Sequence, residues 1–302
     1  MNGIIIIDKP QNYTSFDVVA VIKKLLGEKK VGHTGTLDPM ATGVLPILLG
    51  RATKLQSFLP IAEKEYLAKI KFGLTTDTLD ITGKAISSVS SHIKKEEFQT
   101  ALKGFIGEIE QLPPMYSAVQ KNGVRLYTLA RKGIEVERSS RKVKISRLDL
   151  LWFDEALQEA KLLINCSKGT YIRTLCDDIG KKLGCGAVLK ELQRTKACVF
   201  YLNDSISLDK ARNLVANNNL QKYILPCDGP FKSFNMANIT QPQANRFRNG
   251  GGLSLDRVCF NNKQKLKERE IIRVYKEKES FLGLGKVNFE KGELSVACLV
   301  EI

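Results

Sequence analysis

The sequence predicts an α+β fold in which a mixed or antiparallel sheet is followed by a small β-rich module. Strand-like and helix-like segments are interspersed through the first 230 residues, and they lack the regular βαβ alternation of a parallel sheet. Turn residues then cluster at positions 226–230, before a series of short strand-like runs. Because 302 residues are enough for two domains, we expect one over residues 1–230 and a second over residues 231–302.

The first segments predict a strand, a helix and a second strand. Isoleucines fill positions 4–7 as in a buried strand, and the apolar run at 44–49 has the same character. Between them, Thr14 or Ser15 can cap a helix that Gly27 ends. Helical spacing assigns the buried face of this helix to Phe16, Val19, Ile22 and Leu26.

Patterning also predicts the elements that follow. Alternating or apolar runs indicate strands at 67–72, 143–148, 160–166 and 192–201. Helical periodicity indicates helices at 95–106, 169–183 and 208–217. In the last module, residues 270–275 and 294–302 have the pattern of short strands.

The chain is strongly basic, with 47 Lys and Arg against 32 Asp and Glu and a net charge of +15. Such an excess favours a polyanionic partner, nucleic acid first and an anionic membrane second, over a protein that is merely basic. Residues 121–147 hold nine Lys and Arg against two Glu, a net of +7, interleaved with Tyr127 and apolar residues. No apolar run approaches the roughly 20 residues that span a bilayer, which argues against the membrane.

Cysteine and histidine usage narrows the chemistry. The seven cysteines are widely spaced without a Cys-x-x-Cys pair, which is typical of thiols in a reducing cytoplasm. The first residues lack the basic region and cleavage site of a signal peptide. With only His33 and His92 and no paired cysteines, we expect no zinc site. We expect a monomer.

A loop rich in glycine and proline presents one carboxylate, Asp38. Gly35 and Gly43 can take backbone angles closed to other residues, and Pro39 pushes Asp38 towards an extended conformation. Two interpretations remain: a functional carboxylate, or an ordinary turn with a turn-forming Asp. Residues 32–35 also allow a phosphate loop, although the Gly-Lys-Ser/Thr ending is absent, or the loop of a single-strand-binding KH module.

A second candidate lies where a predicted strand enters a helix, at residues 168–173. Tyr171 and Arg173 are two positions apart, so in an extended entry their side chains would point the same way. A ring and a guanidinium on one side would hold a base together with a negative group. The alternative is a Tyr171 packed in the core and an Arg173 paired at the surface. Two interpretations also remain for residues 64–66: a functional cluster, or exposed charges beside a tyrosine that serves only in packing.

Taken together, the motifs resemble the bacterial TruB family of tRNA pseudouridine synthases, which act on uridine 55 of the T loop. The most specific block is the segment 32–43 around Asp38. The blocks follow the family's order from Gly3 to about Phe200, roughly two-thirds of the chain. The other blocks are Asp8-Lys9-Pro10 with Thr14-Ser15, Lys64-Glu65-Tyr66, Thr76-Asp77-Thr78 with Asp80, Pro114-Met115-Tyr116-Ser117-Ala118, residues 166–173, and Leu183-Gly184-Cys185-Gly186-Ala187 with Leu192 and Arg194.

Two departures from the family pattern stand out. The family usually has Gly where this chain has Asn12, a mild change because Asn also tolerates left-handed geometry. After Pro230 the match is weak, and only residues 246–250 and the β-rich pattern indicate the PUA module that closes such proteins. This last module is also basic, with 13 Lys and Arg against 8 Asp and Glu.

The resemblance implies a cofactor-free isomerisation in which the N1–C1′ bond of uridine breaks and C5 joins C1′. It makes Asp38 the catalytic carboxylate, acting on C1′ as a nucleophile or removing a ribose proton to give a glycal. Arg173 would pair with Asp38 and aim it. Tyr66 would stack on the uracil, and Tyr171 and Leu192 would form the pocket wall.

The resemblance also implies contacts with tRNA. His33 would fill the gap left by the flipped nucleotide and offset part of the cost of extruding it. An insertion at about 118–147 would bind the T-arm by contacting the phosphates of the RNA and recognising the shape of its helix. The basic residues assigned to this contact are Lys121, Arg125, Arg131, Lys132 and Arg141. Two alternatives remain: a non-catalytic tRNA-binding or folding protein, and a synthase for another uridine like the guide-RNA-dependent relatives.

Overall fold

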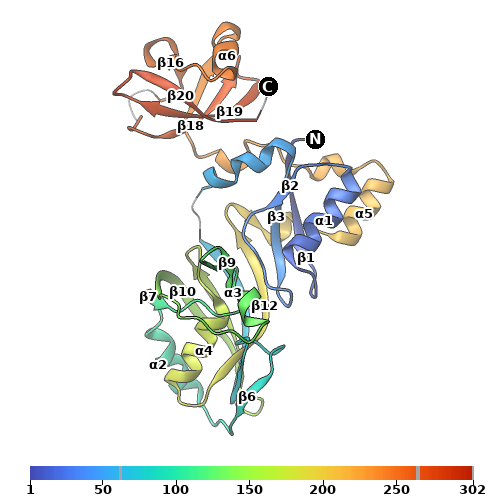
Figure 1. Cartoon of the computed structure of the whole chain (residues 1–302), viewed down its shortest axis with the longest axis vertical. Helices are drawn as coiled ribbons and strands as arrows, with labels where there is room; N and C mark the ends of the chain where they lie inside the picture. The colour runs from blue at the N-terminus through green and yellow to red at the C-terminus, as the bar shows by residue number, and fades with distance from the viewer. Residues whose placement is uncertain (61–62, 263–265, 301–302) are drawn as a thin grey trace.

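The computed structural model describes residues 1–60, 63–262 and 266–300, and it confirms the predicted α+β class (Figure 1). A ten-stranded mixed sheet runs in the order β14-β1-β3-β12-β4-β11-β10-β7, with β2 beside β3 and β13 beside β12. Its neighbours are antiparallel except β1–β14 and β3–β12. The strands are β1 Gly3–Lys9, β2 Val31–His33, β3 Thr42–Leu49, β4 Lys64–Phe72, β7 Gly107–Gln111, β10 Arg141–Asp154, β11 Glu159–Cys166, β12 Ala187–Ala197, β13 Phe200–Tyr201 and β14 Ile206–Ser207.

Helices and short hairpins complete this first unit. The α-helices are α1 Ser15–Leu26, α2 Lys95–Lys103, α3 Leu126–Ala130, α4 Ile172–Lys182 and α5 Leu208–Ala216. Two small hairpins are β5 Leu74–Thr76 with β6 Ala85–Ser88, and β8 Gln120–Lys121 with β9 Val124–Arg125. The 3-10 helices are Gly50–Phe58, Leu202–Asp204, Leu220–Tyr223, Gly229–Phe231 and, further on, Leu255–Arg257.

The C-terminal part is β-rich, as predicted, and it forms its own six-stranded sheet at the upper end of Figure 1. The strand order is β16-β20-β19-β18-β15-β17, and Phe247 of helix α6 (Gln241–Arg248) is fully buried against it. The strands are β15 Met236–Ile239, β16 Leu253–Ser254, β17 Cys259–Phe260, β18 Ile271–Lys276, β19 Ser280–Asn288 and β20 Glu293–Leu299. Of the strand predicted at 294–302, residues 301–302 lie outside the described part of the chain.

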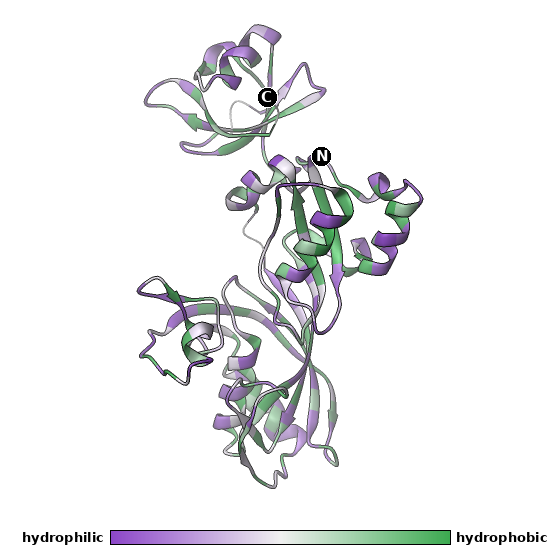
Figure 2. Ribbon diagram, turned by 45° about the vertical axis from the view of Figure 1, so that its right-hand side comes forward, coloured by the Kyte–Doolittle hydropathy of each residue, from purple (hydrophilic) through white to green (hydrophobic). Residues whose placement is uncertain are grey.

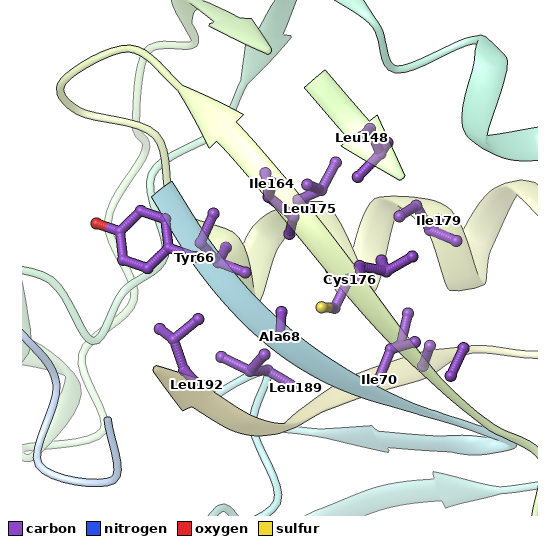
Figure 3. Close-up of a cluster of buried hydrophobic side chains, with 14 of the residues drawn as sticks. Tyr66, Ala68, Ile70, Leu148, Ile164, Leu175, Cys176, Ile179, Leu189 and Leu192 are labelled. Carbon is purple, nitrogen blue, oxygen red and sulfur yellow. The ribbon is translucent and has the colours of Figure 1, made fainter. Parts of the chain in front are cut away.

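Three apolar cores hold the larger sheet. One fills the space between helix α4 and strands β4, β11 and β12, and Figure 3 shows this cluster. A second lies beneath α1 and α5 and packs against β1 and β3. Figure 2 shows these two strands as strongly apolar. A third includes Ile4, Leu284 and Val300, and it therefore packs the C-terminal sheet against the N-terminal strands. Among the described residues, no helix is long and apolar enough to cross a membrane.

Some predicted element details are wrong. Phe16 is 62% exposed, because the buried face of α1 is formed by Ser15, Val18, Val19 and Ile22. Helix α2 ends at Lys103, with Gly104 as its C-cap, so the prediction of helix to residue 106 is too long. Helix α4 starts at Ile172 rather than at Gly169, whose φ of +89° is not helical. Strand β12 starts at Ala187, earlier than the predicted 192.

The larger sheet has a narrow parallel seam in its middle. Strands β3 and β12 pair over only two positions, Thr42 with Gln193 and Gly43 with Arg194. Gly43 has a φ of +102°, and a Cβ added there would lie 2.2 Å from the carbonyl oxygen of Arg194. Only glycine fits this approach, so the glycine allows the two halves of the sheet to join.

We expect Gly43→Ala to lower the free energy of unfolding by at least about 2 kcal/mol, because left-handed strain and a backbone collision add together. Gly107 is a matched control, since its φ is +104° and a Cβ added there meets nothing within 4 Å. Urea denaturation of both alanine variants checks this. Equal losses of stability at the two positions would contradict a role for the close approach at the seam.

Candidate active site

The carboxylate of Asp38 is held by a two-pronged ion pair with Arg173. The Arg173 Nε donates to Asp38 Oδ2 at 2.8 Å, and Nη2 donates to Oδ1 at 3.1 Å. Asp38 lies in the loop between β2 and β3, while Arg173 lies in the first turn of α4. The side chain of Arg173 is only 4% exposed and that of Asp38 is 34% exposed. The surface pairing considered for Arg173 is therefore wrong, and the carboxylate remains open to a ligand.

Two backbone carbonyls accept further hydrogen bonds from Arg173. Its Nη1 donates to the carbonyl of Thr78 at 2.9 Å, and Nη2 donates to the carbonyl of Tyr116 at 2.8 Å. A second carboxylate, Asp80, lies 3.9 Å from the Nε. A planar guanidinium that makes four hydrogen bonds cannot rotate without losing some of them, so it holds the Asp38 carboxylate in one orientation.

Two buried cations hold the loop that carries Asp38. Lys9 is fully buried and donates from Nζ to the carbonyls of Pro10, Tyr13 and Pro39 at 2.9, 2.6 and 3.2 Å. Burial lowers the pKa of Lys9 to about 8. Arg194, also fully buried, donates to the carbonyls of Val44, Gly35 and Thr36 at 2.8, 3.0 and 3.5 Å. Asn12 donates to the carbonyl of Pro39 at 2.8 Å, and its φ of +66° is the left-handed geometry expected there.

Asp38 and Arg173 line a cavity of about 230 Å³. Tyr66, Tyr171 and Leu192 line the same cavity, so five of the six predicted catalytic and substrate-binding residues come together. Figure 3 shows Tyr66 and Leu192 at one end of the apolar cluster, with the Tyr66 hydroxyl pointing away from it. Burial raises the pKa of Tyr66, the nearby Arg194 cation opposes this rise, and Asp38 adds to it. The wall thus combines apolar surface with a neutral phenol.

Tyr171 is clamped from two sides. The buried Gln111 side chain accepts from the Tyr171 N–H at 3.0 Å and donates to its carbonyl at 3.2 Å. The Arg141 guanidinium lies 4.5 Å from the centre of the Tyr171 ring and donates to the carbonyl of Gly169. Arg141 itself lines the cavity, although the family resemblance assigned it to the contact with the T-arm.

His33, the sixth predicted residue, lies outside the cavity at the end of β2. Its ring contacts Phe16 edge to face, with centroids 5.3 Å apart and planes at 88°. Burial, aided by Arg194, lowers the pKa of His33, and its buried Nδ1 has no hydrogen-bond partner among the residues that the structure describes. Residues 32–35 thus form a strand end and a bend instead of a phosphate loop that leads into a helix.

The four other predicted RNA contacts lie on the segment formed by β8, β9 and α3. Lys121, Arg125, Arg131 and Lys132 are all exposed. The Tyr127 ring lies between two of them, 5.9 Å from the Arg125 guanidinium and 5.6 Å from that of Arg131. These cations are therefore available to an anionic partner beside the cavity wall formed by Ser117 and Ala118.

Lys64 is a cavity residue to which the sequence assigned no role. It lies at the start of β4, and its Nζ makes no hydrogen bond or ion pair within residues 1–60, 63–262 and 266–300. Burial lowers the pKa of Lys64 to about 8, with the Arg194 cation adding to the effect. Its position two residues before Tyr66, on the same face of a strand, is the signal that could have identified it. The described residues contain no group of three or more His, Cys, Asp or Glu side chains arranged as metal ligands.

Comparison with known proteins defines the class of this fold and site. Residues 23–172 match the family model described as TruB family pseudouridylate synthase, N-terminal domain. Residues 173–232 match the model described as tRNA pseudouridylate synthase B C-terminal domain. The two matched ranges are adjacent in sequence, and the boundary between them falls within helix α4, just before Arg173. The fold and site are therefore those of a pseudouridylate synthase.

Full-length relatives agree. The chain is 48% identical to tRNA pseudouridine synthase B of Clostridium tetani over 95% of this chain and 96% of the relative. It is 42% identical to the protein of that name from Clostridium kluyveri, over 94% and 95%. The chain belongs to the TruB family, as its motifs indicated.

Solved structures share the fold. One is titled as a complex of Cbf5, Nop10 and Gar1, with a TM-score of 0.72 and 26% identity over 99% of this chain and 83% of that chain. Another is an H/ACA RNP bound to a substrate RNA containing 2′-deoxyuridine, with a TM-score of 0.74 and 24% identity over 99% and 85%. The pseudouridine synthase fold predicted from the motifs is thereby confirmed.

We expect Lys64→Met to raise the free energy of unfolding at pH 7 by about 1–3 kcal/mol, because it removes a poorly solvated ammonium. The pKa of Lys64 in the folded protein is about 8, below its ordinary 10.5. The destabilisation caused by the Lys64 charge is therefore complete below pH 8 and decreases as the pH rises towards 10.5. The stability gained by Lys64→Met should shrink over the same range. Urea denaturation at pH 7 and near pH 10 measures it, with the exposed Lys168→Met as control. A destabilised Lys64→Met at pH 7 would contradict this account.

Proposed function

We propose that the protein converts uridine to pseudouridine at position 55 in the T loop of tRNA, with Asp38 as the catalytic carboxylate. The observation that carries the proposal is the two-pronged Arg173–Asp38 pair at the wall of a cavity lined by two tyrosines. Support for tRNA as substrate comes from the relatives named tRNA pseudouridine synthase B, which match nearly the whole chain.

The site has the groups that this isomerisation needs. The reaction breaks the N1–C1′ bond and joins C5 to C1′ without a net change in oxidation state, so no cofactor is required. Asp38 would attack C1′ as a nucleophile, or it would take a ribose proton to give a glycal. Tyr66 would stack on the uracil, and Leu192 with Tyr171 would keep water from the detached base.

A base within a folded RNA must leave its stack to reach Asp38. Extrusion costs a few kcal/mol, and aromatic groups that replace the lost stacking offset part of that cost. His33 is suited to this task because its lowered pKa keeps the ring neutral and it lies five residues before Asp38. We therefore assign His33 to the space that the flipped nucleotide leaves.

The remaining RNA contacts follow from exposed positive charge. We assign residues 118–147 to the T-arm through Lys121, Arg125, Arg131 and Lys132, with Arg141 nearest the flipped nucleotide. The C-terminal region 231–302 is assigned as a PUA-like RNA-binding domain that follows a catalytic domain of residues 1–230. We further propose that the protein acts as a monomer in the cytoplasm, where its free cysteines would stay reduced.

The alternative is a non-catalytic tRNA-binding or folding protein that uses the same surface. A binder would need neither the oriented carboxylate nor the buried Arg173, whose four hydrogen bonds reach three separate segments of the chain. The intact pair therefore favours catalysis, and folding assistance can accompany it. A synthase that acts on another uridine would differ from this proposal only in the position it modifies. Mapping the pseudouridine in the product distinguishes the two.

We expect Asp38→Asn to abolish pseudouridine formation in an unmodified tRNA transcript while leaving tRNA affinity largely unchanged, because the amide has no negative charge to act on the ribose. Nucleotide-resolution mapping of pseudouridine measures the product, and circular dichroism checks the fold. Asp149→Asn, on the exposed part of β10, is the matched control. Substantial turnover by Asp38→Asn would refute the role of this carboxylate, and full activity on a transcript without uridine 55 would refute the target.

Binding of tRNA should weaken steeply with salt, because Lys and Arg displace counterions from phosphates. For about four phosphate contacts, we expect the tRNA affinity to fall by near 100-fold between 50 and 200 mM salt. The slope of log affinity against log salt concentration should be smaller by about one in each of Lys121→Ala, Arg125→Ala and Arg131→Ala. Filter binding at several salt concentrations measures both quantities. An affinity that changes little over this range would contradict the assignment of residues 118–147.

A further inference from the structure

Phe16 is an exposed aromatic side chain in the first turn of helix α1. It is 62% exposed, although helical spacing predicts it on the buried face. Its only ring contact among the described residues is with His33, edge to face at 5.3 Å. Burying a phenylalanine contributes roughly 1.5–3 kcal/mol to folding, and here most of that gain is absent.

The first turn of α1 is fixed to the segment that carries Asp38. Thr14 and Asp17 form a reciprocal cap, with the Asp17 N–H donating to Thr14 Oγ1 at 3.1 Å and the Thr14 N–H donating to Asp17 Oδ2 at 2.8 Å. The buried Ser15 hydroxyl accepts from the Leu37 N–H at 2.9 Å and donates to the Leu37 carbonyl at 3.3 Å. Phe16 therefore has a fixed position relative to the residue that precedes Asp38.

Other exposed aromatic rings have a different environment. Trp152 and Tyr201, which are 40% and 50% exposed, lie under lysine ammoniums at 5.4 and 5.0 Å. Phe289, 50% exposed, lies in the C-terminal region, away from the catalytic loop. A single exposed apolar residue is common on protein surfaces and needs no explanation. Phe16 is a different case, because its helical turn is fixed to Leu37 and its ring contacts His33, five residues before Asp38.

We propose that Phe16 is a stacking platform for an unpaired base of the RNA substrate, next to the position assigned to His33. The inference rests on the proposed function and adds a subsite to it. Proteins recognise single-stranded RNA loops by stacking bases on exposed aromatic rings, and every base has a face that can stack. Phe16 and His33, at nearly perpendicular angles, offer two aromatic surfaces to bases displaced together with the target uridine.

Phe16→Ala should weaken binding of a T-arm stem-loop RNA by roughly 5- to 150-fold, the range of one lost base stack. Phe16→Trp should keep wild-type affinity, because it retains an aromatic face. Ile86→Ala, at an apolar position that is 68% exposed on β6, is the matched control and should bind as wild type. Wild-type affinity in Phe16→Ala would overturn the proposal.

A second comparison separates stacking on RNA from simple support of His33. Phe16→Leu keeps an apolar contact for His33 but has no aromatic face, so it should bind as weakly as Phe16→Ala. The effect of Phe16→Ala should also persist in a His33→Ala background. Wild-type affinity of Phe16→Leu, or loss of the Phe16 effect when His33 is absent, would assign Phe16 to support of His33 and overturn the stacking role.

The same samples distinguish failure of the inference from failure of the proposed function. Wild-type protein that binds the stem-loop but forms no pseudouridine would refute the function. Normal pseudouridine formation together with wild-type affinity in Phe16→Ala would refute only the stacking subsite.

Discussion

The site depends on a buried cation, Arg194, which donates hydrogen bonds to backbone carbonyls and also lies against the Tyr66 phenol. Its side chain is fully buried, and it donates to Val44 on β3 and to Gly35 and Thr36 in the loop before Asp38. An unpaired buried charge is costly, so these three carbonyls must stay in place for the protein to tolerate the guanidinium. Arg194 thus couples the two-residue seam between β3 and β12 to the loop that presents the carboxylate.

This coupling places the candidate site beside a short pairing in the middle of the sheet. A seam of two residue pairs contributes little pairing of its own, and Gly43 brings the two backbones too close for any side chain to fill the gap. The buried guanidinium of Arg194 adds one hydrogen bond from β12 to β3, at the carbonyl of Val44. Arg173 then secures the other side of the cavity by joining Asp38 to the carbonyls of Thr78 and Tyr116. Arg173 and Arg194 therefore connect the segments on both sides of the cavity through hydrogen bonds to backbone carbonyls and to Asp38.

The sequence predicted features that depend on local chemistry. A cap at Thr14 or Ser15, the stop at Gly27 and the buried strand at 44–49 follow from rules that act over a few residues, and the structure has all three, with Thr14 as the cap. The family motifs further identified five residues that the structure brings into one cavity. The exposure of Phe16 could not be predicted, because Ser15 takes the buried position by bonding to Leu37, 22 residues away. The clamp of Gln111 on Tyr171 likewise joins residues 60 apart.

The electrostatic balance of the cavity connects its stability with its substrate. Lys64, Arg141 and Arg173 line it and Arg194 lies directly behind, whereas Asp38 is the lining carboxylate and Asp80 the nearest second one. Burial lowers the pKa of Lys64, and repulsion from the nearby Arg194 cation lowers it further. A polyanion entering the cavity would relieve that repulsion, whereas a neutral ligand would not. The same charges that lower the stability of the free protein therefore favour RNA as its ligand, in keeping with the net charge of +15.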